Sequence, residues 1–167
     1  IRVFLEWSEI VGLNETDRYL IVNPFFHTFG YKAGFLACLL RGATMLPVPI
    51  FDIPVVLQKI SDEKISAIPG PPTLYLTILN HPDRAKFDLS SLRLAVTGAA
   101  AVPVEMIKRM RDELNFEVIL TAYGLTESTG TVTMCRAEDD PVTISTTSGR
   151  AITDVEVRIV DENNTEV

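Results

Sequence analysis

An aromatic ring, a glycine, a hydroxyl and a carboxylate stand close together in the stretch Tyr123-Gly124-Leu125-Thr126-Glu127. The stretch follows an apolar run, residues 116–120, which has the composition of a buried strand. Open α/β sheets bind ligands at the carboxyl ends of their strands. There the ring could stack on a base, the hydroxyl could bond a phosphate oxygen, and the carboxylate is a hard ligand suited to Mg²⁺. The stretch indicates a nucleoside triphosphate site, although such a segment taken alone is usually an ordinary turn with a solvated glutamate.

Two other segments carry residues that could serve the same site. His27 stands among aromatic residues in the segment 23–34. A lone histidine in such company is more often a satisfied, partly buried side chain than a catalytic one. The segment 92–103 has the pattern of a strand that runs into small residues and then into a helix. Small side chains allow a ligand to approach the backbone closely.

Together the three segments resemble the signatures of the adenylate-forming superfamily, which includes acyl-CoA synthetases, luciferases and the adenylation domains of peptide synthetases. Residues 121–130 contain the Tyr-Gly-Leu-Thr-Glu signature, and residues 24–30 are similar to the Pro-Phe-x-His-x-x-Gly segment that lines the acyl site. Residues 97–103 are similar to the Ser/Thr-Gly-Gly-Ala-Pro turn beside the adenine and the acyl chain. The sequence departs from these patterns at Ala99, Ala101 and Ala122, where each added methyl group could narrow the acyl pocket.

The resemblance implies a role for each matching residue. The catalytic residues implied are His27, Thr126 and Glu127, with Glu127 as the metal ligand for Mg²⁺. The nucleotide-binding residues implied are Gly98, Ala99, Ala100, Ala122, Tyr123, Gly124 and Thr126. The acyl-binding residues implied are Phe25, Phe26, His27, Phe29, Ala99 and Leu125. The cofactors implied are ATP, released as AMP, together with Mg²⁺ and coenzyme A.

The activity implied is the activation of a carboxylic acid. ATP and the acid would give an acyl-adenylate and pyrophosphate, and a thiol would then displace AMP. Amino-acid-activating relatives place an aspartate within the segment that matches residues 25–30, and this segment has no acidic residue. We therefore expect an uncharged acyl tail, from a fatty acid or a bulky alicyclic or aromatic acid, with coenzyme A as acceptor. An adenylation domain that loads a carrier protein, a later oxidative step as in luciferases, and a non-catalytic nucleotide-binding module stay open.

Composition sets limits on the other function classes. A chain of 167 residues with 47% hydrophobic residues can bury a substantial core. Its net charge of −7 argues against nucleic-acid binding, which normally needs a basic surface. Cys38 and Cys135 have no metal-site spacing, so we expect free thiols and a cytoplasmic location. The apolar stretch 34–40 is too short to span a membrane.

The resemblance also bears on the extent of the chain. Family members carry a phosphate-binding loop before the region where this chain begins, and a ribose-binding aspartate and a small carboxy-terminal domain after the region where it ends. We therefore expect this chain to be an internal piece of a longer protein, inactive by itself. No signal peptide is visible in the opening residues Ile1-Arg2-Val3.

The hydrophobic pattern alternates between helix and strand spacing. Helices are predicted over residues 2–11, 31–40, 53–61, 73–80 and 104–114, and strands over residues 19–23, 43–48, 65–69, 92–97, 117–121 and 155–160. In the first helix, Ile1, Phe4 and Leu5 are predicted to face inward, with Trp7 as a further candidate; Gly42 and Asp52 are predicted to end one helix and cap another. The pattern predicts an α/β fold with a mainly parallel sheet and helices on both faces. We expect residues 1–141 to form an acyl- and nucleotide-binding subdomain, and residues 142–167 to begin a small β-barrel subdomain.

Overall fold

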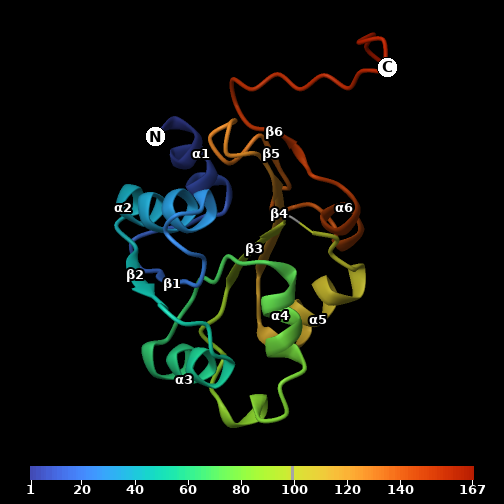
Figure 1. Cartoon of the computed structure of the whole chain (residues 1–167). Coiled ribbons are helices and arrows are strands. Elements are labelled where there is room, and N and C mark those ends of the chain that lie inside the picture. The colour runs from blue at the N-terminus through green and yellow to red at the C-terminus, as the bar shows by residue number, and fades with distance from the viewer. Residues whose placement is uncertain (99) are drawn as a thin grey trace.

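The structure, a computed structural model, describes residues 1–98 and 100–167 (Figure 1). Its helices are α1 (Arg2–Ile10), the π-helix η1 (Phe29–Leu36), α2 (Ala37–Arg41), α3 (Ile53–Glu63), α4 (Pro72–Leu79), the 3₁₀ helix η2 (Arg84–Lys86), α5 (Val104–Leu114) and α6 (Pro141–Thr146). Its strands are β1 (Arg18–Ile21), β2 (Thr44–Pro47), β3 (Leu94–Gly98), β4 (Val118–Tyr123), β5 (Thr133–Met134) and β6 (Arg150–Ala151). The expected α/β class is confirmed by this alternation.

The strands form a mainly parallel sheet in two parts. β1 pairs with β2, and β3 pairs with β4, both in parallel; β5 and β6 extend the second part as antiparallel strands. The segment 66–70 joins the two parts, because Ala67 forms parallel bridges to both Tyr19 and Leu94. The parallel strands therefore all point the same way, and their carboxyl ends share one edge.

A full strand was expected over residues 65–69, and this prediction is wrong. Only Ala67 has bridge geometry, although Leu20 N donates to Ala67 O at 2.9 Å and Gly70 N donates to Val96 O at 2.9 Å. Proline cannot donate to a strand ladder, and Pro69 stands inside this segment. The proline therefore leaves a short link where the pattern predicted a regular strand.

Helices cover both faces of the sheet, as predicted. α1 contacts η1 and α2, whereas α3 contacts α4, α4 contacts α5, and α5 contacts α6. Figure 1 shows α1 and α2 to the left of β3 and β4, and α5 and α6 to the right. No helix in the described part of the chain has the length and apolar character needed to cross a membrane.

The buried face of α1 differs from the predicted one. Its inward residues are Val3, Phe4, Trp7 and Ser8, whereas Ile1 is 79% exposed and Leu5 is 44% exposed. Ile1 precedes the first helical residue, and a helical step of about 100° turns Leu5 away from the core once Phe4 faces it. The helix therefore directs two adjacent aromatic side chains, Phe4 and Trp7, toward the sheet.

The predicted helix over residues 31–40 is present, but its first part is a π-helix. η1 runs over Phe29–Leu36 and passes directly into α2, which ends at Gly42 in the left-handed conformation with φ of 71°. The buried hydroxyl of Tyr19 donates to Ala33 O at 2.8 Å and so ties η1 to β1. The predicted cap of α3 is confirmed, because Asp52 Oδ1 accepts from Val55 N at 3.1 Å.

The last residues leave the body of the protein. The strand predicted over residues 155–160 is not formed: Val160 makes one antiparallel bridge to Glu166, and the described residues contain no closed barrel. Figure 1 shows this red segment running away from the other elements. Ile159 is 70% exposed, so the alternating pattern has no partner sheet to pack against. The boundary expected between residues 141 and 142 stays a prediction, although Ile144 and Ile152 are buried in the core.

Candidate functional site

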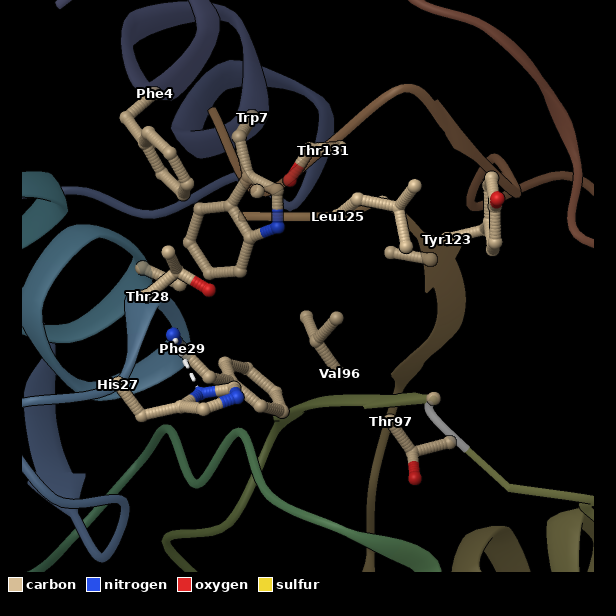
Figure 2. Close-up of a pocket in the computed structure, with 15 residues that line it drawn as sticks. Phe4, Trp7, His27, Thr28, Phe29, Val96, Thr97, Tyr123, Leu125 and Thr131 are labelled. Atoms are coloured by element: carbon tan, nitrogen blue, oxygen red, sulfur yellow. Dashed lines mark hydrogen bonds between the residues drawn. The ribbon is translucent and has the colours of Figure 1, made fainter. Parts of the chain in front are cut away.

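A cavity of about 320 Å³ lies where β3 and β4 end (Figure 2). Helix α1, the start of η1 with the loop before it, the two strand ends and the loop after β4 all contribute to its wall. The lining residues are Phe4, Trp7, His27, Thr28, Phe29, Ala33, Val96, Thr97, Gly98, Ala122, Tyr123, Gly124, Leu125, Gly130 and Thr131. Most of this surface is apolar, and no lysine, arginine, aspartate or glutamate is among the lining residues.

The floor of the cavity depends on a close approach between β3 and β4. Gly98 is paired with Ala122, and a Cβ atom built on Gly98 would lie 2.5 Å from Ala122 O. A larger residue at position 98 would therefore push the strand ends apart. The next side chain that points into the cavity is that of Val96, two residues earlier on β3 (Figure 2).

The loop after β4 is a tight turn that returns the chain to β5. Leu125 O accepts from Gly130 N at 2.8 Å and from Ser128 N at 3.1 Å, and Ser128 Oγ accepts from Leu125 N at 2.9 Å. A Cβ atom on Gly124 would lie 2.3 Å from Gly130 O, so the turn has room only for glycine there. The turn exposes Thr126 and Glu127, whose side chains form no hydrogen bond or ion pair with a described residue.

His27 occupies the opposite side of the cavity from Tyr123. Its Nδ1 accepts a hydrogen bond from Phe29 N at 3.1 Å, which is the dashed line in Figure 2. Because Nδ1 is the acceptor, the neutral imidazole carries its proton on Nε2. His27 therefore holds a hydrogen-bond donor at a fixed ring orientation at the mouth of the cavity.

Seven of the residues assigned to the site from the sequence meet at this cavity. These are His27, Phe29, Gly98, Ala122, Tyr123, Gly124 and Leu125. Ala100, Thr126 and Glu127 are exposed outside the lining, and Ala99 lies outside the described residues. Phe25 and Phe26 are 53% and 94% exposed and do not reach the cavity; the Phe25 ring instead packs edge-to-face on Phe35 at 6.3 Å.

The sequence did not reveal several lining residues. Phe4 and Trp7 were expected only as core residues of the first helix, and Thr28 and Thr131 were not singled out. The helical spacing indicates that Phe4 and Trp7 point toward the sheet, but not that β3 ends beneath them. A polar indole nitrogen on an inward face was the one local signal that could have drawn attention to Trp7.

The magnesium site expected from the sequence contains one carboxylate, that of Glu127. No group of three or more histidine, cysteine, aspartate or glutamate side chains that could hold a metal lies within the described residues. Magnesium is commonly bound through one or two carboxylates together with substrate phosphates and water. The carboxylate of Glu127, which is exposed and forms no ion pair with a described residue, fits that kind of site.

Known proteins resemble this chain over most of its length. The family model described as "AMP-binding enzyme" matches residues 2–167. A protein of Rhodococcus jostii named "3-[(3aS,4S,7aS)-7a-methyl-1,5-dioxo-octahydro-1H-inden-4-yl]propanoyl:CoA ligase" is 61% identical over 156 residues, which are 93% of this chain and 30% of that protein. A Mycobacterium tuberculosis protein of the same name is 55% identical over 93% of this chain and 31% of its own length. A Bacillus subtilis protein named "Putative acyl-CoA synthetase YngI" is 38% identical over 92% of this chain and 28% of its own length.

Solved structures show the same fold. The anthranilate CoA ligase AuaEII, solved in complex with anthranoyl-AMP, superposes with a TM-score of 0.89 at 27% identity and covers 99% of this chain and 32% of its own. The N-terminal domain of FACL13 from Mycobacterium tuberculosis gives a TM-score of 0.86 at 26% identity, over 98% of this chain and 40% of its own. The chain thus spans about three tenths of the length of the curated relatives it matches. Because the family model matches nearly every residue, this chain belongs to the family of AMP-binding enzymes.

Proposed function

We propose that the intact protein carrying this chain activates a carboxylic acid with ATP and transfers the acyl group to coenzyme A. In the first step a carboxylate oxygen attacks the α-phosphorus, and pyrophosphate leaves with the electron pair of the broken bond. In the second step the sulfur of coenzyme A attacks the acyl carbon, its proton is lost, and AMP leaves. The observation that carries this proposal is that one cavity brings His27 together with the loop of Tyr123 and Leu125 at the strand ends.

The nucleotide is proposed to lie along the ends of β3 and β4. The Tyr123 ring is 48% exposed and is available to stack on adenine. The close pair of Gly98 and Ala122 offers backbone without bulky side chains, as a flat base requires. Ala99, Ala100 and Gly124 would complete this backbone surface.

The phosphates are proposed to lie above the turn after β4. Thr126 would donate its hydroxyl to a phosphate oxygen, and Glu127 would hold Mg²⁺. When bound, the magnesium ion neutralises phosphate charge and so stabilises the transition state. His27 would direct its Nε2 proton toward the reacting carboxylate, since its Nδ1 is already engaged by Phe29 N.

The acid is proposed to be compact, with an uncharged tail beneath α1. Phe29 and Leu125 lie on the cavity wall together with Phe4 and Val96, and Phe25 and Phe26 would contribute only from outside this cavity. A volume of about 320 Å³ is near the lower end of the range of about 300–1,000 Å³ for small-molecule pockets. It suits a fused ring better than a long chain. The bicyclic dione acid named for the two relatives at 61% and 55% identity, here called the dione acid, is therefore the first acid to test.

The two cysteines bear on the cellular location of the protein. We propose a cytoplasmic enzyme, since both Cys38 and Cys135 are buried free thiols, as is usual where the surroundings are reducing. Its partners would be the small acid and coenzyme A.

The test is ATP–pyrophosphate exchange by the intact protein with the dione acid and with fatty, aryl and amino acids. Glu127→Ala should lower exchange by about 10²–10³-fold, the range seen when a charge-stabilising group is removed, while the affinity for the acid changes little. Glu105→Ala is the matched control, because Glu105 is an exposed residue of α5 and is not part of the cavity lining. Unchanged exchange in Glu127→Ala would refute the metal role, and no exchange with any acid would refute the ligase proposal. Thioester formation on free coenzyme A separates this function from the loading of a carrier protein.

A further inference from the structure

Trp7 is the single tryptophan of the chain and is 1% exposed, yet it lines the cavity. Figure 2 shows its indole hanging from α1 into the space between Thr28 and Leu125, with the ring nitrogen on the side that faces Leu125. The neighbouring ring of Phe4 lies 6.2 Å away, tilted by 42°, and limits how far the indole can turn. Helix α1 therefore directs one N–H group into an otherwise apolar part of the cavity.

This N–H group has no partner among the described residues. Figure 2 draws one hydrogen bond between the lining residues, from Phe29 N to His27 Nδ1, and none at Trp7. Figure 2 likewise marks no bond from the side chains of Thr28 and Thr131 to another residue that it draws. Trp7 Nε1 is not one of the fully buried polar atoms that lack a partner among the described residues, which are Thr97 Oγ1, Arg111 Nε and Thr133 Oγ1. Its N–H therefore borders the open space of the cavity, where an acceptor of a bound ligand can pair with it.

The chemistry of the donor limits what that acceptor can be. An indole N–H only donates, so the acceptor must be an oxygen or nitrogen with a free lone pair. The wall around it, formed by Phe4, Phe29, Val96 and Leu125, would reject a charged group, because burying an unpaired charge is unfavourable. A neutral carbonyl oxygen on an apolar ring meets both requirements.

We propose that the Trp7 N–H recognises a ring carbonyl of the acid and makes the enzyme select oxygenated ring acids over plain hydrocarbon acids. This inference rests on the proposed ligase function and adds a specificity residue to it. A site built to bond a polar group discriminates strongly against an analogue that lacks the group, whereas an apolar wall discriminates weakly. The hydroxyls of Thr28 and Thr131 also line the cavity, but a hydroxyl can both donate and accept a hydrogen bond, whereas the Trp7 N–H only donates.

The experiment compares the dione acid with its analogue in which both ring carbonyls are replaced by methylene groups. Steady-state pyrophosphate release by the intact protein is measured for both acids, with wild type and with Trp7→Phe, which keeps an aromatic ring and removes the N–H. Wild type should prefer the dione acid by about tenfold or more in kcat/KM, and Trp7→Phe should lose about tenfold on that acid alone. The loss should appear in KM rather than in kcat, because the ring is remote from the reacting carboxylate.

Two variants guard against an effect of packing. Phe4→Leu reshapes the same wall without touching a donor, so it should lower kcat/KM for both acids alike. Replacement of Trp7 by 3-benzothienylalanine keeps the shape of the indole and exchanges N–H for sulfur. It should lower kcat/KM for the dione acid alone, as expected for Trp7→Phe. It provides the same test if the smaller ring of phenylalanine disturbs folding. Equal losses on the two acids, or a wild type that turns over other acids but does not prefer the dione acid, would overturn the inference. Failure of wild type on every acid would instead overturn the ligase function on which it rests.

Discussion

The carboxylate of Asp17 is 1% exposed and joins three segments at the amino edge of the sheet. It accepts from Arg93 Nε at 2.9 Å and from Arg93 Nη2, from Ser66 Oγ at 2.6 Å and from Asn14 N at 3.0 Å. Burial raises the pKa of Asp17, but the bonds from Arg93, Ser66 and Asn14 and the charge of Arg93 outweigh it and hold the pKa below the ordinary value. The carboxylate thus stays ionised and holds the start of β1 to the start of β3.

Arg93→Met would keep an unbranched stem and remove the guanidinium, leaving Asp17 with two of its four hydrogen bonds. Breaking a buried pair in this way typically costs about 3–5 kcal/mol. For a chain of this size each kcal/mol lowers Tm by about 2–4 °C, so the variant should melt roughly 6–20 °C below the wild type. Most of this cost reflects the charge left behind rather than the net strength of the pair.

The loss of stability in Arg93→Met should be larger at neutral pH than at acid pH. In the wild type the lowered pKa of Asp17 contributes stability above the unfolded value, about 3.9, and this contribution is lost as pH falls through the folded pKa. In Arg93→Met burial is no longer outweighed, so the pKa of Asp17 should rise above its unfolded value. The variant's deficit should therefore be greatest at pH 7 and shrink as Asp17 is protonated.

Urea denaturation followed by circular dichroism, at pH 7 and at pH 4, measures both effects on the free energy of unfolding. Arg158→Met is the matched control, because Arg158 lies in the exposed last segment and makes no ion pair with a described residue; its expected effect is within about 0.5 kcal/mol. A deficit below about 1 kcal/mol for Arg93→Met at pH 7, or one that is the same at pH 4, would refute the reasoning.

Three other changes test separate parts of the structure. Gly124→Ala places a Cβ atom 2.3 Å from Gly130 O and should lower ATP–pyrophosphate exchange of the intact protein by more than about tenfold, since small displacements of positioning groups are expensive; full exchange would show that the turn adapts. Tyr75→Phe removes a buried hydroxyl that donates to two main-chain carbonyls and should lower the free energy of unfolding in urea by about 1–3 kcal/mol; a loss below about 0.5 kcal/mol would contradict this. Cys38 is buried, and burial together with the charge of Asp17 raises its pKa to about 12, so the native protein should not react with a thiol reagent at pH 8 until urea is added; rapid reaction of Cys38 in the native state would contradict its burial.

Local signals predicted the local structure well. Asp52 and Gly42 act at single helix ends, where one side chain or one backbone conformation decides the outcome, and both predictions are confirmed. The strands that pair in parallel were found because continuous apolar runs such as residues 94–96 are buried on both faces.

The structure differs from the predictions where contacts with residues distant in the sequence decide the conformation. Residues 155–160 alternate like a strand, but a strand forms only where another supplies hydrogen bonds, and Val160 meets only Glu166. Trp7 has the spacing of a core residue, and it is a cavity residue only because β3 and β4 end below it. Likewise, nothing in the order Phe25-Phe26-His27 tells which ring turns outward; that direction is set by η1, where Gly30 packs against Pro24 O with no room for a side chain.

The parallel strands separate two kinds of chemistry in space. The hydrogen bonds between Asp17 and Arg93 hold their amino ends together, and the cavity opens at their carboxyl ends, one strand length away. Strands of 4–6 residues are roughly 13–20 Å long, beyond the 7–10 Å within which substitutions commonly interact. Substitutions that change acid preference and substitutions that change the free energy of unfolding should therefore have independent effects. A laboratory selection for a new acid could begin from a variant made more stable at the amino edge of the sheet. That added stability would tolerate destabilising changes at cavity residues such as Val96 or Leu125, with the contacts of Asp17 left unchanged.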